Sequence, residues 1–326
     1  MDSMSRRSVL AAAAVAAPFV GRVARAQADW PTRPVRFVIP FTAGGAGDTA
    51  ARAVGQKLGE ILGQNIVIEN RTGGNAVVAA NVVLQAPRDG YTYLWDAANQ
   101  ITNPVLVRDL PFDYRTSFVP VSLLALFPQV LAVKTDFPAH TLAEFIEVAK
   151  RRPGTITCGT PPTAGMGHLA LELFQKLAGI RLVHTGYRGG ADAARDITAG
   201  HIDSILLTSS TVRGPVQAGK ARVLAVTSAQ RIAALPDVPT FAEQGFPGYE
   251  MDDWNGLYAP AGAPREMLPR LQRAIAEATR DPAVLARMAP LGTVLVGAGA
   301  DEFASFLERK RTVIEQLIRD VGITLG

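Results

Sequence analysis

The chain has 326 residues, of which 48% are hydrophobic and 19% are charged, a balance typical of a folded protein long enough for two domains. Residues 1–26 hold four arginines and one aspartate, so they carry +3 of the formal net charge of +4. The rest of the chain is nearly neutral and has no basic run, which excludes the charge pattern of a nucleic-acid-binding protein. Cys158 is the only cysteine, so an internal disulfide is excluded.

The first 26 residues predict an export signal. Arg6 and Arg7 precede a stretch of small apolar residues, a pattern of the twin-arginine type. Residues 24–26 read Ala-Arg-Ala, the form that signal peptidase prefers, so cleavage is expected after Ala26 or Ala28. The apolar stretch is about half as long as a membrane span, which favours a cleaved signal over an uncleaved anchor.

A strand, a glycine loop and a helix are expected next. Residues 35–39 form a short β-branched run, and apolar residues recur at helical spacing from Thr49 to Leu62. Between them, residues 40–48 read Pro-Phe-Thr-Ala-Gly-Gly-Ala-Gly-Asp. Glycines let backbone N–H groups crowd together, and a helix start adds unpaired donors and a positive dipole end. This corner is therefore suited to an anion, either a carboxylate or a phosphate.

The same corner matches a dinucleotide-binding fingerprint. Residues 45–50 fit G-x-G-x-x-A, and Glu69 stands about 20 residues further on, where a ribose-binding acid would be expected. Against this reading, Pro40 and Phe41 lengthen the loop, and Asp48 puts a negative charge close to the place of a pyrophosphate. A third interpretation is that the glycines make only a tight turn and that Asp48 only caps the helix.

From residue 34 onward, strand and helix signals alternate in two series, which predicts parallel sheets. Strands are expected over 65–69, 91–95, 129–133, 155–158, 181–184, 202–207 and 222–227. Helices are expected over 76–84, 141–151, 169–177 and 191–198, followed by two amphipathic helices around 268–278 and 303–318. An extended connection is predicted over 103–120, because this segment is rich in proline. Two series of similar weight indicate two lobes, and small ligands usually bind in the cleft between lobes.

A set of short motifs runs in order through about residues 30–322. It includes Pro-Phe-Thr-Ala-Gly-Gly at 40–45, Glu-Asn-Arg at 69–71, Pro-Arg-Asp-Gly-Tyr-Thr at 87–92, His-Leu-Ala at 168–170, Tyr-Arg-Gly at 187–189, Leu-Pro-Asp-Val-Pro-Thr at 235–240 and Ala-Pro-Ala-Gly at 259–262. Each motif is weak alone, but their ordered combination is specific. It resembles the solute-binding proteins of tripartite tricarboxylate transporters, the Bug family.

The resemblance implies a type II periplasmic binding protein fold, with two α/β lobes and a ligand cleft between them. After the signal at 1–26, residues 29–130 would form the first part of lobe one and 131–250 lobe two. Residues 251–326 would return to lobe one and end in its C-terminal helices. The implied protein is a periplasmic receptor, expected to act as a monomer, that captures a small organic carboxylate for membrane transporter subunits. No enzymatic activity, cofactor or metal is implied, and the four histidines lack the spacing of metal ligands.

The resemblance also implies which residues bind the ligand. One jaw is the glycine loop, a second contact precedes Asn103, and the opposing jaw is the loop before His168. From these loops the expected contacts are Phe41, Thr42, Ala43, Gly44, Gly45, Asp48, Ala98, Asn99, Thr163, Ala164, Gly165 and Met166, and Leu207 and Trp254 are added as positions that would make the cleft less polar. Backbone donors at helix starts would hold the two polar ends of a ligand and keep the lobes closed. Asp48 is expected to orient its loop rather than contact a carboxylate, because two anions repel, and Trp254 suits the core and the cleft wall equally.

Some positions depart from the family pattern. Family members often carry hydroxyls where Gly165, Met166 and Gly167 stand, and an Asp where Leu207 stands. These differences predict a less polar cleft for an aromatic or monocarboxylic acid, and they disfavour an amino acid, whose ammonium would lose a partner. Two other functions stay open at this point: an exported NAD(P)-dependent oxidoreductase, and a receptor that signals to a membrane sensor instead of serving transport.

Overall fold

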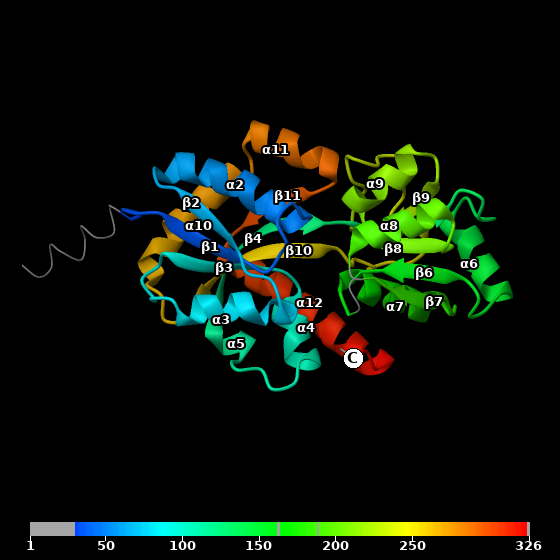
Figure 1. Ribbon diagram of the computed structural model, residues 1–326, viewed down its shortest axis with the longest axis horizontal. Coiled ribbons are helices and arrows are strands. Elements are labelled where there is room, and N and C mark those ends of the chain that lie inside the picture. The colour runs from blue at the N-terminus through cyan, green and yellow to red at the C-terminus, as the bar shows by residue number, and fades with distance from the viewer. Residues whose placement is uncertain (1–29, 162–163, 188, 325–326) are drawn as a thin grey trace, which may run out of the picture.

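The computed structural model describes residues 30–324 except 162, 163 and 188, and it has two α/β lobes (Figure 1). The predicted export signal, with Ala26 and Ala28, lies outside the described residues, as does Thr163. Each lobe is built on one sheet with helices on both faces, as the alternating pattern predicts. None of the described helices is long and apolar enough to span a membrane.

The lobe-one sheet has six strands in the order β11-β4-β10-β3-β1-β2. The strands are β1 (Val35–Ile39), β2 (Ile66–Asn70), β3 (Thr92–Asp96), β4 (Phe118–Phe127), β10 (Asp253–Pro260) and β11 (Val294–Ala298). β1 is parallel to β2 and β3, whereas β10 is antiparallel to β3 and β4. The prediction of a purely parallel sheet is wrong here, because β10 enters the sheet in the opposite direction when the chain returns from lobe two.

Two groups of helices cover this sheet. On one face lie α2 (Ala46–Leu62), α10 (Leu268–Ala278) and α11 (Pro282–Met288); on the other lie α3 (Val77–Gln85), α4 (Asn99–Leu106) and α12 (Ala300–Val321), with the short α5 (Tyr114–Ser117) beside α4 (Figure 1). Side chains alternate between the faces along a strand. Phe37 of β1 packs toward α2, for example, while Val38 packs toward α3.

The lobe-two sheet has five strands in the order β7-β6-β8-β5-β9. The strands are β5 (Gln129–Lys134), β6 (Thr157–Thr160), β7 (Val183–Gly186), β8 (Ser204–Thr208) and β9 (Ala221–Val226), and the helices are α6 (Leu142–Arg151), α7 (Met166–Ala178), α8 (Gly190–Ala199) and α9 (Ser209–Gln217). β5 runs antiparallel to β8 and β9, so this sheet is mixed as well. Cys158 is buried in β6, and burial raises the pKa of its thiol to about 12, so it is an inert core residue.

Two chain segments connect the lobes. The first passes from β4 through Pro128 into β5, and the second returns at Asp252 into β10. They are tied together, since the Gln129 N–H donates to Thr227 Oγ1 (2.9 Å), which donates in turn to Asp252 Oδ1 (2.7 Å). The predicted boundaries near residues 130 and 250 fall close to these connections, and the division of the chain into domains stays a prediction.

The segment 103–120 differs from the expected extended connection. It contains the end of α4, with Pro104 inside the helix, and the beginning of β4. Tertiary contacts stabilise α4 here, because Ile101 is fully buried and the Asn103 amide donates to Asn75 O and to Tyr114 Oη. These partners lie 28 and 11 residues away in the chain, so the local pattern could not reveal them.

Candidate ligand-binding site

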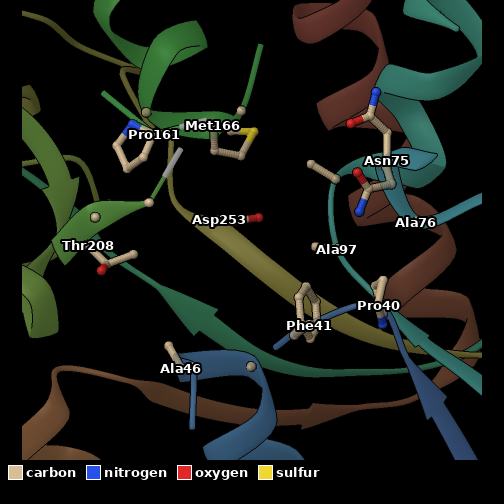
Figure 2. A pocket seen from close by; sticks show the side chains of 18 of the residues that line it. Pro40, Phe41, Ala46, Asn75, Ala76, Ala97, Pro161, Met166, Thr208 and Asp253 are labelled. Carbon is tan, nitrogen blue, oxygen red and sulfur yellow. The ribbon is translucent and has the colours of Figure 1, made fainter. Parts of the chain in front are cut away.

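A cavity of about 650 Å³ lies between the lobes, within the usual size range of a small-molecule site (Figure 2). Its described lining residues belong to both lobes, and most of them lie at the ends of strands or the starts of helices. Nine of the residues expected to bind ligand line it: Phe41, Thr42, Gly45, Ala98, Asn99, Ala164, Gly165, Met166 and Leu207. The two jaws expected from the sequence therefore face one cavity.

Six helices start at this cavity, and each has its first residue or its N-cap in the lining. They are α2, α3, α4, α7, α8 and α9, whose N-caps are Gly45, Ala76, Ala98, Gly165, Gly189 and Thr208. In the described part of the chain, none of these six N-cap side chains accepts a hydrogen bond from its helix. Among the helices that start elsewhere, α6 and α11 are capped by Thr141 and Asp281, whereas α10 and α12 have no side-chain cap. The cavity therefore collects helix starts with no side-chain acceptor and several positive dipole ends, an arrangement that favours an anion.

Asp48 stabilises the first jaw, the glycine loop, although its side chain does not line the cavity. Its carboxylate accepts hydrogen bonds from Gly44 N–H (2.9 Å), Arg52 Nε (2.9 Å) and Asn70 Nδ2 (2.8 Å), and Asn70 Nδ2 also donates to Phe41 O. Burial opposes ionisation of Asp48, but these hydrogen bonds outweigh it and lower the pKa below its ordinary value. Gly44 has a φ of 81°, a conformation that glycine adopts without strain. The loop is thus fixed by one buried anion.

Replacing Asp48 is expected to weaken ligand binding although its side chain lies outside the cavity lining. Asp48→Ala removes the carboxylate that accepts hydrogen bonds from Gly44, Arg52 and Asn70, so the glycine loop loses its support. The affinity for the ligand should then fall about tenfold, which is the effect expected from losing hydrogen bonds to one charged group. Calorimetric titration with a bound acid measures the change. Asp281→Ala is the control, because Asp281 caps α11 away from the cavity and its loss should leave affinity unchanged. Equal affinities for Asp48→Ala and wild type would show that the loop needs no such anchor.

His168 holds the second jaw. Its Nδ1 accepts a hydrogen bond from Ala164 N–H (3.0 Å), and Ala164 has a φ of 63°, which is strained for a residue other than glycine. Nδ1 is an acceptor, so the ring proton lies on Nε2, which faces Glu172 Oε1 at 3.5 Å. The ring stacks on His184 with a centroid separation of 3.8 Å, and burial and the neighbouring His168 lower the pKa of His184 to about 4.

The role of His168 can be tested with two substitutions. His168→Leu removes the acceptor for Ala164 N–H, so the strained turn should relax and ligand affinity should fall about tenfold. His168→Asn places Oδ1 where Nδ1 stands and should restore most of that loss. Dissociation constants of both variants decide the matter, and an Asn variant as weak as the Leu variant would contradict the role of this hydrogen bond.

Four expected contacts do not line the cavity: Ala43, Gly44, Asp48 and Trp254. Ala43 and Gly44 belong to a loop whose lining residues are its neighbours Thr42 and Gly45. Trp254 is fully buried, and its ring packs edge-on against Phe306 of α12 at 5.3 Å. It is therefore a core residue. Thr163 cannot be placed, because it lies outside the described residues.

Sequence reasoning missed several lining residues: Asn75, Ala76, Gln129, Gly189, Gly190, Thr208, Thr211 and Asp253. Some could have been found, since Gly189 and Gly190 precede an expected helix and Thr208 follows an expected strand, where the ligands of open α/β sheets gather. Asn75 and Ala76 could not, because their lining position depends on a turn in which both have positive φ.

The dinucleotide reading finds no support in the position of Glu69. Its carboxylate forms ion pairs with Arg36 (3.1 Å) and Arg71 (2.5 Å) and is not part of the cavity lining. Among the described residues, no three His, Cys, Asp or Glu side chains gather where they could hold a metal ion.

Comparison with known proteins identifies the family. Residues 50–323 match the family described as tripartite tricarboxylate transporter family receptor. The chain is 34% identical to a UPF0065 protein from the tcbD-tcbE intergenic region of Pseudomonas sp. (strain P51), and the alignment covers 96% of this chain and 95% of that protein.

Two solved structures share the fold. The R. palustris protein Rpa4515 with adipate has a TM-score of 0.80 at 33% identity, covering 91% of this chain and 99% of the other. MatC from Rhodopseudomonas palustris with bound malate has a TM-score of 0.74 at 26% identity, covering 89% and 100%. The expected type II, two-lobed fold is confirmed. The chain belongs to the tripartite tricarboxylate transporter receptor family.

Proposed function

We propose that this protein is a periplasmic receptor that binds a small organic carboxylate between its lobes and delivers it unchanged to membrane transporter subunits. The observation that supports this most is the convergence of six uncapped helix starts on one cavity. Backbone N–H groups at such starts can neutralise a carboxylate without a cationic side chain. None of the described lining residues is cationic, and Arg188, beside Gly189, lies outside the described residues.

The ligand class is proposed to be a monocarboxylic acid, including aromatic ones. Adipate and malate in the two related structures support a carboxylate. In this chain, Phe41 adds apolar surface for a carbon skeleton, and the almost fully buried Met166 and Leu207 put apolar side chains at the cavity wall. Asp253 also belongs to the lining and would repel a second carboxylate placed near it. One acid group and a less polar remainder fit this lining best.

A ligand screen tests the proposal. Thermal-shift and calorimetric titrations would compare benzoate, hexanoate, malate and adipate on the exported, processed protein, with analytical ultracentrifugation to check that it is a monomer. A monocarboxylate should raise the melting temperature and be recovered unchanged by mass spectrometry. If no acid binds at millimolar concentration, or if a product forms, the proposed function is wrong.

Two further measurements separate this function from its rivals. A bound dinucleotide would add adenine absorbance that survives desalting, as an oxidoreductase requires. A transport receptor should lose its physiological effect when the transporter subunits are deleted, so uptake of the labelled acid should stop. Continued uptake in that deletion strain would contradict coupling to a transporter of this type.

A further inference from the structure

Asp253 lies at the base of the cavity, at the first position of β10. It is opposite Phe127 of β4, where the chain re-enters lobe one. Figure 2 shows its carboxyl oxygen directed into the space between Ala97 and Phe41 on one side and Thr208 and Pro161 on the other. Asp253 therefore lies between lining residues that come from the two lobes.

The carboxylate of Asp253 has few partners. Its Oδ1 accepts a hydrogen bond from Trp254 N–H (2.8 Å), and no other residue in the described part of the chain donates to it. It is also the only ionisable side chain among the described lining residues. A ligand that displaces water from the cavity would leave the second oxygen without a donor, and a buried acceptor without a donor is costly.

The surroundings make a negative charge at Asp253 unfavourable. Burial raises the pKa of its carboxyl to about 7, and the charge of Asp96 at the end of β3 adds to this effect. The Trp254 N–H acts in the opposite direction but does not cancel it. A donor on the ligand would relieve this penalty, whereas a second ligand carboxylate would increase it.

We propose that Asp253 is a specificity-determining residue that accepts a hydrogen bond from the ligand, so the ligand is an organic acid with one carboxylate and a hydroxyl or ammonium donor. This inference rests on the proposed function. The carboxylate of the ligand occupies the helix starts, and its donor meets Asp253. Leu207 in place of an Asp does not exclude amino acids, because Asp253, at the start of β10, offers an ammonium group a different partner.

Matched acids test the preference in the wild-type protein. Hexanoate, 6-hydroxyhexanoate, 6-aminohexanoate and adipate differ only at one end, and the four-carbon series of butanoate, 4-hydroxybutanoate, 4-aminobutanoate and succinate repeats the comparison. In at least one series, the hydroxyl or amino acid should bind about 10- to 100-fold more tightly than the plain acid, the gain expected from a hydrogen bond to a charged group. The dicarboxylate should bind no more tightly than the plain acid.

The variant Asp253→Asn tests whether this side chain causes the preference among the acids. It keeps the shape but removes the charge, so the advantage of the amino acid should fall about tenfold or more, while the dicarboxylate should gain affinity. Asp281→Asn removes one charge outside the cavity and should leave the order of affinities as in wild type. Circular dichroism and the melting temperature of each variant show that it is folded.

The outcomes separate the two proposals. If acids bind but Asp253→Asn leaves the ratio of amino to plain acid unchanged, Asp253 does not determine specificity, and the receptor function stands. If the wild type prefers the dicarboxylate in both series, the inference is likewise wrong. If no acid of either series binds, the proposed function fails and this inference fails with it.

Discussion

Gly167→Ala is expected to lower the free energy of unfolding by about 1–3 kcal/mol, the cost of overpacking a tight contact, and to weaken ligand binding at the same time. A Cβ at this position would stand 2.7 Å from the carbonyl oxygen of Leu206 in β8 and 3.5 Å from Thr160 Cβ in β6. The first of these atoms is backbone and cannot rotate away. The start of α7 must therefore move off the sheet, and Gly165 and Met166 move with it.

The two effects need separate measurements. Denaturant unfolding gives the stability, and calorimetric titration gives the affinity, which should fall at least about tenfold if the second jaw is displaced. Gly299→Ser is the matched control: Gly299 is the N-cap of α12, an added Cβ there meets no atom within 4 Å, and serine is a good N-cap. Wild-type affinity and stability in Gly167→Ala would show that β8 accommodates a methyl group at this contact.

The fold was predictable where local patterns agree with tertiary structure. β1 spans residues 35–39 as expected, and α6 begins after Thr141, whose side chain accepts from Glu144 N–H. Amphipathic spacing also located α10 and α12. The helices α6, α10 and α12 each bury one face and expose the other, so their periodicity carries the information.

β10 escaped prediction because its surroundings are set by distant residues. It lies in the middle of the sheet between β3 and β4 and is buried on both faces, so its polarity does not alternate. Gly256 marks a close approach, since a Cβ there would stand 2.0 Å from the Phe303 ring of α12. That contact joins residues 47 positions apart, and no local pattern contains it.

The candidate site also contains residues that local motifs predict and residues that only tertiary structure places. Resemblance to a family indicated the two glycine loops that line the cavity, because their motifs are contiguous in sequence. Trp254 suited the core and the cleft wall equally, and the structure places it in the core and the neighbouring Asp253 in the lining. Adjacent strand residues point to opposite faces, so a shift of one residue exchanges core and site. Only the pairing of β10 with β4 fixes which of the two residues faces the cavity.

The pH dependence of affinity should have opposite signs for two acids of the same length. The pKa of Asp253 is raised to about 7, so its ionised fraction in the free protein rises from about one tenth at pH 6 to about nine tenths at pH 8. An ammonium group binds the ionised form, so the affinity for 6-aminohexanoate should increase about tenfold over this range. Adipate favours the protonated form, and its affinity should decrease as the pH rises.

Asp253→Asn isolates this group from the others that titrate nearby. Burial also raises the pKa of Asp96, and that of Asp252 to about 7, but both residues are retained in the variant and neither is part of the cavity lining. His184, with a pKa lowered to about 4, stays neutral from pH 6 to pH 8. The variant should therefore lose the opposite slopes of the two acids. If both slopes persist in Asp253→Asn, another group carries the charge change; if wild type shows none, Asp253 does not face the ligand's variable end.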